Sequence, residues 1–442
     1  MAAGLAIDND TGAVFLYGGF DDKGFRKDMH MYDVTTFQWT KINMHNDKSD
    51  DDDGGGGETD KKKKKSSSSN NNKPSSSCPG PRAHVRMVVV SRHVVLFGGS
   101  TPDNECTEDL YVMDVSSSKA LAWIRVDNCN ADEPTTQNNE DGTTSASSTT
   151  KAPSPTGRYG HALCAVSGSY VALFGGLGPD DRYLNDLWLL DCSEIASGNI
   201  SWEYQQPSGT YWPKSRDSHA LCSIGKDLVL LGGCNAVPGS ILPRGEIEIY
   251  SFETRTWRCV ATCGEAPVAG PNVCLHALGR SGKVLAISSA SGGIFNQLSV
   301  LEYESTPKLW TTVRLDWKGD WTMVPGQRDF FSSVFDDMEG ALYVFGGRAG
   351  GKDGMIHDTL VTANFADVMG LTDEAAEGGA EHDGAGGEGA DGGDDDDEYV
   401  EEVPTTTAKK NLAQGGKAML PGIDRFKDNR AYNNTEETKK GR

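Results

Sequence analysis

Arginine recurs in one repeated sequence context, so the guanidinium group is the binding chemistry that this chain offers most often. The contexts "PRAH", "GRYGH", "SRDSH" and "QRDFF" hold Arg82, Arg158, Arg216 and Arg328. In each case a β-rich stretch follows and leads to a pair of glycines. A guanidinium group binds carboxylates and phosphates through paired hydrogen bonds. Arginines repeated in this way favour an anionic ligand.

Histidine also recurs in the repeats, and histidine is a common metal ligand. The residues concerned are His84, His161, His219 and His276. We expect them to occupy equivalent positions in successive repeats, where each ring bonds to the backbone of a neighbouring segment. Residues spread out in this way do not bring three ligands to one metal ion. No metal and no other cofactor is predicted.

The ten cysteines do not predict a disulfide framework, because a long chain without a secretory signal is expected to stay reduced. Cys164 and Cys222 stand at the same place in "HALCAV" and "HALCSI", which predicts two buried thiols. Cys259 and Cys263 have no second pair at ligand spacing, so a zinc site is not predicted.

The elements that must position these residues form an internal repeat. A strand-like stretch ends in two glycines in "FLYGG", "VLFGG", "ALFGG", "VLLGG" and "YVFGG", and "LAISS" is a degenerate sixth copy with Ser288 and Ser289 in the glycine positions. An alternating strand such as "DLYVMDV" follows each copy. Tryptophan then follows in five of the six copies, at Trp39, Trp123, Trp202, Trp257 and Trp310. Each repeat therefore predicts four antiparallel strands.

This order of motifs resembles the kelch repeat, in which each unit is one blade of a β-propeller. The resemblance covers residues 1–365 and implies an all-β, six-bladed kelch-type propeller. The tryptophans are then expected to pack between blades. The glycines are expected where the chain is crowded against the next blade. The resemblance also implies a protein-interaction module, scaffold or adapter that recognises an acidic or phosphorylated peptide of an unidentified protein partner.

The topology of such a blade predicts where the partner binds. The loop after the glycines and the connection between blades emerge on the same side, next to the arginine that opens each first strand. We expect a positive rim there, formed by Arg82, Arg158, Arg182, Arg216, Arg244, Arg328 and Arg348, together with Lys23, Arg26 and Lys352. The alternative is that the repeated arginine bonds to neighbouring loop carbonyls or carboxylates.

Some kelch-like propellers are metal-dependent enzymes of the oxidase or specifier type, and others serve ubiquitin ligases as substrate adapters. Catalysis is not predicted here, because no phosphate-binding loop, serine elbow or close carboxylate pair stands out. Glu246 and Glu248 in "EIEIY" are expected to face solvent or a neighbouring blade. The enzyme and ubiquitin-ligase roles remain as alternatives.

Composition limits the remaining classes. A net charge of -22 disfavours direct binding to nucleic acid or to an anionic membrane. No apolar stretch of membrane-spanning length occurs, which favours a cytoplasmic location. The lysine run Lys61–Lys65 leaves nuclear import as an alternative. The oligomeric state is left open.

Low-complexity segments interrupt and follow the repeats. Residues 46–80 and 127–156 are predicted to be disordered insertions, and residues 366–442 a disordered tail that is first acidic and then basic. The sixth repeat lacks a tryptophan strand. Either "EYVEEV" at Glu398–Val403 supplies the missing strand, or the native protein starts before Met1, and the second explanation is favoured.

Overall fold

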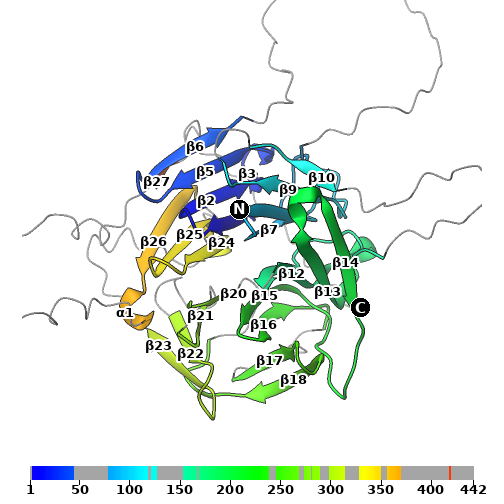
Figure 1. The fold of residues 1–442 in the computed structure, drawn as a ribbon, viewed down its shortest axis with the longest axis vertical. Helices are drawn as coiled ribbons and strands as arrows, with labels where there is room; N and C mark the ends of the chain where they lie inside the picture. Colours follow the sequence, from blue (N-terminus) through cyan, green and yellow to red (C-terminus); the bar gives the residue numbers. More distant parts are fainter. Residues whose placement is uncertain are drawn as a thin grey trace, which may run out of the picture.

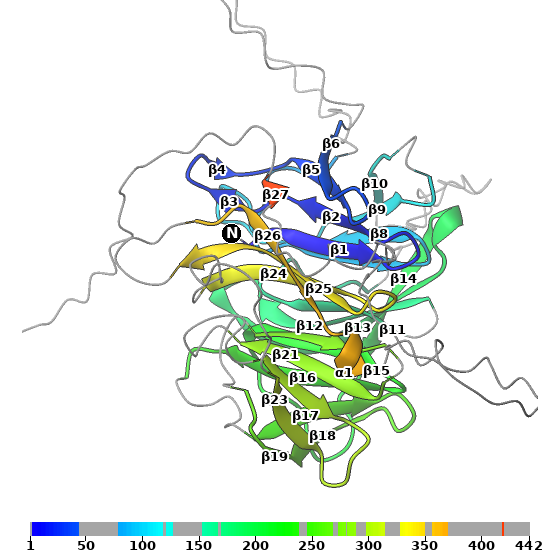
Figure 2. The same ribbon diagram turned by 90° about the vertical axis from the view of Figure 1, so that its left-hand side faces the viewer.

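The computed structural model of this chain is a ring of six antiparallel sheets, seen face-on in Figure 1 and edge-on in Figure 2. The structure describes residues 2–43, 78–117, 121–126, 153–166, 169–237, 245–267, 273–279, 281–288, 298–313, 328–349, 356–369 and 418–419. Consecutive sheets follow one another round the ring, each as one blade. The predicted six-bladed β-propeller is confirmed.

The first three blades each contain four strands in chain order from the centre outward. Blade 1 consists of β1 (Gly4–Asp8), β2 (Ala13–Tyr17), β5 (Met29–Asp33) and β6 (Gln38–Ile42), with a small hairpin, β3 (Phe20–Asp21) and β4 (Gly24–Phe25), in its loop. Blade 2 consists of β7 (Arg86–Val90), β8 (His93–Phe97), β9 (Leu110–Asp114) and β10 (Ile124–Val126). Blade 3 consists of β11 (Ala162–Val166), β12 (Tyr170–Leu177), β13 (Tyr183–Glu194) and β14 (Asn199–Gln205), with short 3-10 turns η1 (Pro179–Asp181) and η2 (Ile195–Ser197).

The other three blades complete the ring. Blade 4 consists of β15 (Asp217–Ile224), β16 (Asp227–Cys234), β17 (Glu246–Ser251) and β18 (Thr256–Ala261). Blade 5 consists of β20 (Val273–Ala277), β21 (Lys283–Ser288), β22 (Leu298–Glu302) and β23 (Leu309–Val313), and β19 (Cys263–Gly264) pairs in parallel with β23. Blade 6 consists of β24 (Arg328–Asp336), β25 (Ala341–Ala349), β26 (Thr359–Asn364) and β27 (Ala418–Met419).

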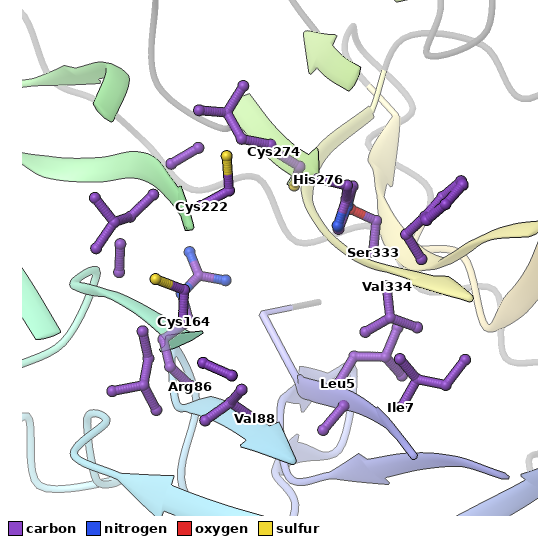
Figure 3. Close-up of a pocket in the computed structure, with 18 of the residues that line it drawn as sticks. Leu5, Ile7, Arg86, Val88, Cys164, Cys222, Cys274, His276, Ser333 and Val334 are labelled. Atoms are coloured by element: carbon purple, nitrogen blue, oxygen red, sulfur yellow. The ribbon is translucent and has the colours of Figure 1, made fainter. Parts of the chain in front are cut away.

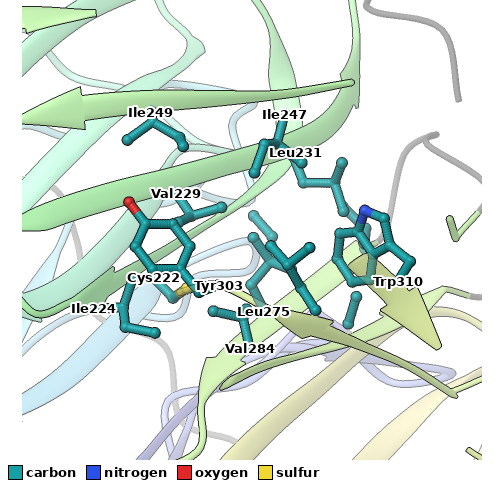
Figure 4. Packing of buried hydrophobic residues seen from close by; sticks show 14 residues of the cluster. Cys222, Ile224, Val229, Leu231, Ile247, Ile249, Leu275, Val284, Tyr303 and Trp310 are labelled. Carbon is teal, nitrogen blue, oxygen red and sulfur yellow. The ribbon is translucent and has the colours of Figure 1, made fainter. Parts of the chain in front are cut away.

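The core lies between blades, as the alternating apolar pattern predicts. Figure 4 shows the contact between blades 4 and 5, where Trp310 packs against Leu231 and Ile247. The other repeated tryptophans also lie next to the preceding blade in the ring; for example, the ring centroids of Trp202 and Phe97 are 5.3 Å apart. All five tryptophans are buried. Their predicted packing role is confirmed.

The glycine pairs occur where two blades meet. Gly98 has a φ of +69°, and a Cβ atom added there would lie 2.5 Å from the carbonyl oxygen of Arg158 in the next blade. A side chain would collide with this backbone, and the left-handed conformation itself disfavours most other residues. The predicted reason for the glycine is confirmed at this position.

The fourth strand of blade 6 comes from far along the chain. Ala418 and Met419 pair with Leu360 and Thr359 of β26, and β27 also lies beside β6 of blade 1 (Figure 2). The segment Glu398–Val403, which was expected to supply this strand, lies outside the described residues. The tail does supply a strand to blade 6, but the strand described is Ala418–Met419.

The expected start of the disordered tail at residue 366 is wrong by a few residues. The chain continues as a helical turn, α1 (Ala366–Met369), because Phe365 is buried and Met369 packs near Gly340. The amino group of Lys283 also donates to the carbonyl of Val368 over 3.2 Å. Most of the two predicted insertions lies outside the described residues. None of the helices in the described ranges is both long and apolar enough to cross a membrane.

Candidate functional site

The strand-opening arginines are buried inside their blades. Arg158 is 0% exposed. Its Nε donates to the carbonyl of Thr156 over 3.0 Å, and its Nη1 donates to the carbonyl of Gly175, also over 3.0 Å. Asp186, at the start of the third strand, accepts from Nη1 at 2.6 Å and from Nη2 at 2.8 Å. We call this arrangement of one arginine, two carbonyls and one carboxylate the arginine clamp.

The same clamp is present in blades 2 and 4. Arg82 and Arg216 are 3% and 1% exposed. In blade 2 the carboxylate is Asp109, 3.2 Å from Nη2 of Arg82. In blade 4 it is Glu248, 2.6 Å from Nη1 of Arg216. The clamp thus ties the end of the second strand to the start of the third strand within one blade.

Main-chain hydrogen bonds at the clamp join blades 2, 3 and 4 each to the blade before it. At the junction of blades 3 and 4, the amide of Gly176 donates to the carbonyl of Arg216 over 2.9 Å, and the amide of Arg216 donates to the carbonyl of Leu184 over 3.0 Å. Equivalent pairs of bonds join blade 1 to blade 2 and blade 2 to blade 3. These bonds place the strand-opening arginines beside the loops that follow the glycines. We call this side of the ring the loop face.

The expectation of an open ring of guanidinium groups must therefore be corrected for Arg82, Arg158 and Arg216. Each group is buried and satisfied by its own blade, because an unpaired buried charge would be costly. The geometry fits the alternative drawn from the sequence, in which the arginine bonds to loop carbonyls and carboxylates. Contact of these arginines with a partner stays a prediction.

The other predicted rim residues do not join them in one group. Arg182 is exposed, Arg348 is half-buried, and Arg26 lies 3.1 Å from the carboxylate of Asp21. Arg328 pairs through its backbone with Ala349. Lys23 is exposed on the turn of the blade 1 hairpin. Arg244 and Lys352 lie outside the described residues.

Asp186 shows the electrostatic effect of the clamp. Burial works to raise the pKa of this carboxyl group, but the hydrogen bonds and charge of Arg158 outweigh burial and lower the pKa below its ordinary value. The indole of Trp188 also donates to Asp186 over 2.7 Å. Asp186 therefore stays ionised and keeps Arg158 neutralised well into the acidic range.

A ring of left-handed residues surrounds the channel on the loop face. Each precedes the inner strand of its blade or lies near its start, with φ between +51° and +63°. The ring, which we call the mouth ring, consists of Ala2, His84, Gly160, Ser218 and Phe330. Its main chain is bonded from blade to blade: the amide of Ala2 donates to Phe330, that of His84 to Ala2, and that of Ser218 to Gly160, over 2.8 to 2.9 Å. Non-glycine residues in this conformation often accompany functional sites.

Aromatic side chains gather at one part of the mouth ring. The ring of His84 lies 5.7 Å from that of Tyr159 and 5.5 Å from that of Phe330, measured between centroids. Phe330 is 39% exposed. An exposed aromatic residue at a rigid rim is a suitable anchor for a partner protein.

The loops of blades 2 and 3 add negative charge to the loop face. Their exposed carboxylates are Asp103, Glu105, Glu108, Asp180 and Asp181, and the exposed cation of these two loops is Arg182. The two loops are close, because the thiol of Cys106 in blade 2 contacts the carbonyl of Leu177 in blade 3 at 3.7 Å. The described loop face of these two blades is therefore acidic, whereas a basic rim was predicted on this face.

A comparison with models of known protein families agrees with the propeller fold. The model for the KLHDC2/KLHL20/DRC7 Kelch-repeats domain matches residues 138–320. This chain is a kelch-repeat protein. The predicted resemblance is confirmed.

Known proteins that carry similar kelch segments differ in their other parts. The kelch chain is 29% identical over 212 residues to the F-box/kelch-repeat protein At1g51550 of Arabidopsis thaliana, across 46% of this chain and 37% of that protein. It is 27% identical over 187 residues to Adagio-like protein 3 of Oryza sativa subsp. japonica, across 42% and 25%. It is 26% identical over 217 residues to the serine/threonine-protein phosphatase BSL2 of Arabidopsis thaliana, across 49% and 16%. The matches therefore span well under two thirds of each relative.

The expected equivalence of the kelch histidines is wrong for two of the four. His161 and His219 are equivalent, and the Nε2 atom of His219 donates to the carbonyl of Phe174 over 3.1 Å. His84 stands one position earlier, with the left-handed backbone of Gly160 and Ser218. In blade 5 the residue equivalent to His219 is Val273, because Val273 pairs with Ser288 as His219 pairs with Gly232. His276 therefore stands three positions later on its strand than His219. In the sequence, this shift of His84 shows as the spacing between arginine and histidine, which is one residue shorter in "RAH" than in "RYGH".

The expected position of Glu248 in the kelch propeller is also wrong. This side chain is 1% exposed and binds Arg216 of its own blade, and Tyr211 donates to it over 2.6 Å. It faces inward because its carboxylate neutralises the buried guanidinium group of the strand-opening arginine. Sequence reasoning did not identify Asp109, Asp186 and Glu248 as a set, although each lies near the start of a third strand.

The cysteines of the kelch propeller differ in exposure. Cys222 is buried, as predicted, and Cys164 is half-buried at the central channel. Cys259 and Cys263 are exposed. Across the described ranges, no group of three or more His, Cys, Asp or Glu side chains is placed to hold a metal ion.

Proposed function

We propose that this propeller is a protein-recognition module that binds a basic, unstructured segment of its partner on the loop face of blades 2 and 3. The observation that carries the proposal is that exposed carboxylates occupy these loops and that Tyr159 of the aromatic cluster is bonded through its main chain to Leu177 of the blade 3 loop. Kelch relatives with F-box and Adagio names support a protein-interaction role in general terms.

Charge complementarity explains why the segment should be basic. The clamp arginines offer no free charge, since each is paired within its blade. Asp103, Glu105 and Asp180 are exposed on two adjacent loops. Facing charges of opposite sign favour encounter and fix orientation, and an aromatic anchor supplies apolar contact.

A substrate-adapter role in a ubiquitin ligase is a second candidate. It is favoured by the F-box/kelch-repeat relative, in whose name a kelch segment is joined to an F-box. The same loop face would then hold the substrate. Another relative is named a phosphatase, so enzymatic activity, carried by a longer protein that contains this propeller, is an alternative to test.

A random-peptide phage library selected on the immobilised full chain tests the proposed surface without a known partner. We expect selected peptides to be enriched in Lys, Arg and aromatic residues. Selection should be lost in a quadruple variant, Asp103→Lys, Glu105→Lys, Asp180→Lys and Asp181→Lys. Enrichment of Asp and Glu, or equal selection by the variant, would contradict the proposal.

The matched control places the same kind of charge change on the opposite side of the ring. Glu253→Lys and Glu304→Lys lie in turns between third and fourth strands and are exposed. Such turns emerge on the face opposite to the loop face. We expect this control to select the same peptides as the wild type.

A further inference from the structure

A cavity of about 310 Å³ occupies the central channel. The inner strands of all six blades line it, with side chains such as Leu5, Val88 and Val334 giving it apolar walls (Figure 3). Lining residues extend as far as Asn9 and Asp337, near the ends of their inner strands. This size and character suit a small molecule.

One register position of the six inner strands holds a small residue in every blade except one. The residue at this position pairs with the second-strand residue that precedes the first glycine of the glycine pair. In blade 5 the paired residue is the one that precedes Ser288. Its occupants are Gly4, Arg86, Ala162, Ala220, Cys274 and Ser332, opposite Tyr17, Phe97, Phe174, Leu231, Ile287 and Phe345. We call this set the channel ring. Gly4 does not line the cavity, and the other four small residues line it together with the arginine.

Arg86 uses only part of its guanidinium group for the fold. Its Nε donates to the carbonyl of His161 in the next blade over 3.0 Å. Ser332, at the equivalent position, makes the equivalent bond to the carbonyl of Ala3 over 2.6 Å. A serine is thus sufficient for this structural contact. The two Nη groups of Arg86 are left to project into the channel (Figure 3).

No counter-charge for Arg86 is present in the described part of the channel. The clamp arginines each have a carboxylate, whereas no ion pair to Arg86 is formed among the described residues. Asp337 also lines the channel, but it comes five residues after Ser332, the residue of blade 6 that is equivalent to Arg86. Five residues of strand span about 16 Å along the channel at ~3.3 Å per residue. Its carboxylate accepts from the amide of Gly279 instead.

The thiols around Arg86 do not supply the missing charge. Burial raises the pKa of Cys164, of Cys274 and, to about 12, of Cys222. These groups therefore stay protonated at neutral pH. The same burial lowers the pKa of Arg86 itself, because its charge is removed from water without full compensation.

We propose that the central channel binds a small organic anion, whose carboxylate or phosphate oxygens contact the Nη groups of Arg86 and whose apolar body lies against the channel walls. An arginine presents paired donors that match both kinds of oxyanion. The channel ring gives the head group space beside Arg86. This site is separate from the loop face and does not depend on the proposed protein partner.

Titration calorimetry on the full chain tests the site, with inorganic phosphate as a head-group probe and phenyl phosphate as a probe with an apolar body. At constant ionic strength we expect both to bind saturably, and phenyl phosphate to bind more tightly. Arg86→Met should weaken both at least about tenfold, since a charge-assisted pair contributes more than 1.4 kcal/mol. Arg255→Met removes an exposed cation outside the channel and should bind as the wild type does.

Two outcomes would overturn the site. One is equal affinity in Arg86→Met and wild type, and the other is no saturable heat with the wild type up to about 10 mM of either probe. Arg86→Met loses the Nε bond to the carbonyl of His161 but also removes an uncompensated charge, so without phosphate it should melt close to the wild type. If Arg86→Met does not fold, Cys274→Leu keeps the cation and narrows the cavity beside it, and it should lose phenyl phosphate binding; retained binding would contradict the proposal.

Discussion

At the scale of single residues, the arginine clamps show how a charge can be repeated without forming a binding site. Three guanidinium groups bind carbonyls and a carboxylate in their own blades. Arg86 differs because its blade provides no carboxylate for it. The same residue type therefore serves two purposes, and the partner of each guanidinium group distinguishes them.

Breaking a clamp should destabilise the protein strongly. Glu248→Gln leaves Arg216 buried with no counter-charge, and we expect the free energy of unfolding to fall by about 3 kcal/mol, the lower end of the range for buried ion pairs. Urea unfolding followed by tryptophan fluorescence measures this change. Glu246→Gln on the same strand is the control, with an expected change under about 0.5 kcal/mol; equal effects would argue against the clamp.

Two half-buried histidines predict a dependence of stability on pH. Burial lowers the pKa of His276 and of His84 to about 4. Because the folded pKa is below the unfolded value, the contribution to stability is complete above about pH 6.5 and is lost as the pH falls toward 4. His276→Gln should remove up to about 3 kcal/mol of this fall between pH 7 and 4. An unchanged pH profile in His276→Gln would refute the expectation.

At the scale of elements, blade 6 is completed by a strand distant in sequence. Only two residues of β27 pair with β26, whereas β6 pairs with β5 over five residues. A short pairing of this kind is held weakly. The outer edge of blade 6 is consequently the least protected sheet edge that the described strands present.

Proline at the paired position should expose this edge. Met419→Pro removes a backbone donor opposite Thr359, and we expect amides in residues 359–364 to exchange hydrogen at least about threefold faster. Hydrogen exchange with mass spectrometry resolves this peptide from the rest. Lys410→Pro, elsewhere in the tail, is the control. No difference between the two variants would show that β27 does not protect β26.

Much of this element structure can be predicted from the sequence. The glycine pairs, the alternating strands and the tryptophans predict six blades because each feature repeats in register. The clamp carboxylates are harder to predict, since "TED", "LND" and "EIE" look like ordinary loop or strand acids. Arg86 could not be distinguished at all, because only the strand register reveals that its five equivalents are small.

At the scale of the whole molecule, the two ends of the folded chain meet where the ring closes. The inner strand of blade 1 lies between β24 and β7, and Ser332 donates to the carbonyl of Ala3 over 2.6 Å. Unlike the other blades, blade 1 contacts blade 6 without a chain connection near the junction. Closure therefore depends on the hydrogen bonds of β1 and on the packing of blade 1 against blade 6, where Trp39 contacts Phe345.

Removing residues 1–8 should open the ring. We expect a fall in melting temperature of more than about 10 °C, because two blade junctions lose apolar burial and hydrogen bonds together. Small-angle scattering should show a larger radius of gyration in the truncated protein. Removing residues 420–442 instead should leave the melting temperature unchanged. A truncated ring with wild-type melting and size would disprove this account of closure.

The mouth ring has a consequence for engineering. Its blade-to-blade hydrogen bonds are made by main-chain atoms, so they use no side-chain donor or acceptor, although the left-handed backbone limits which residues fit at each position. The outer parts of the loops that follow the glycines, away from clamp residues such as Asp109, could accordingly be exchanged for randomised sequences while the underlying ring is retained. The propeller would then serve as a display framework, with diversity on one side and an independent anion-responsive channel at its centre.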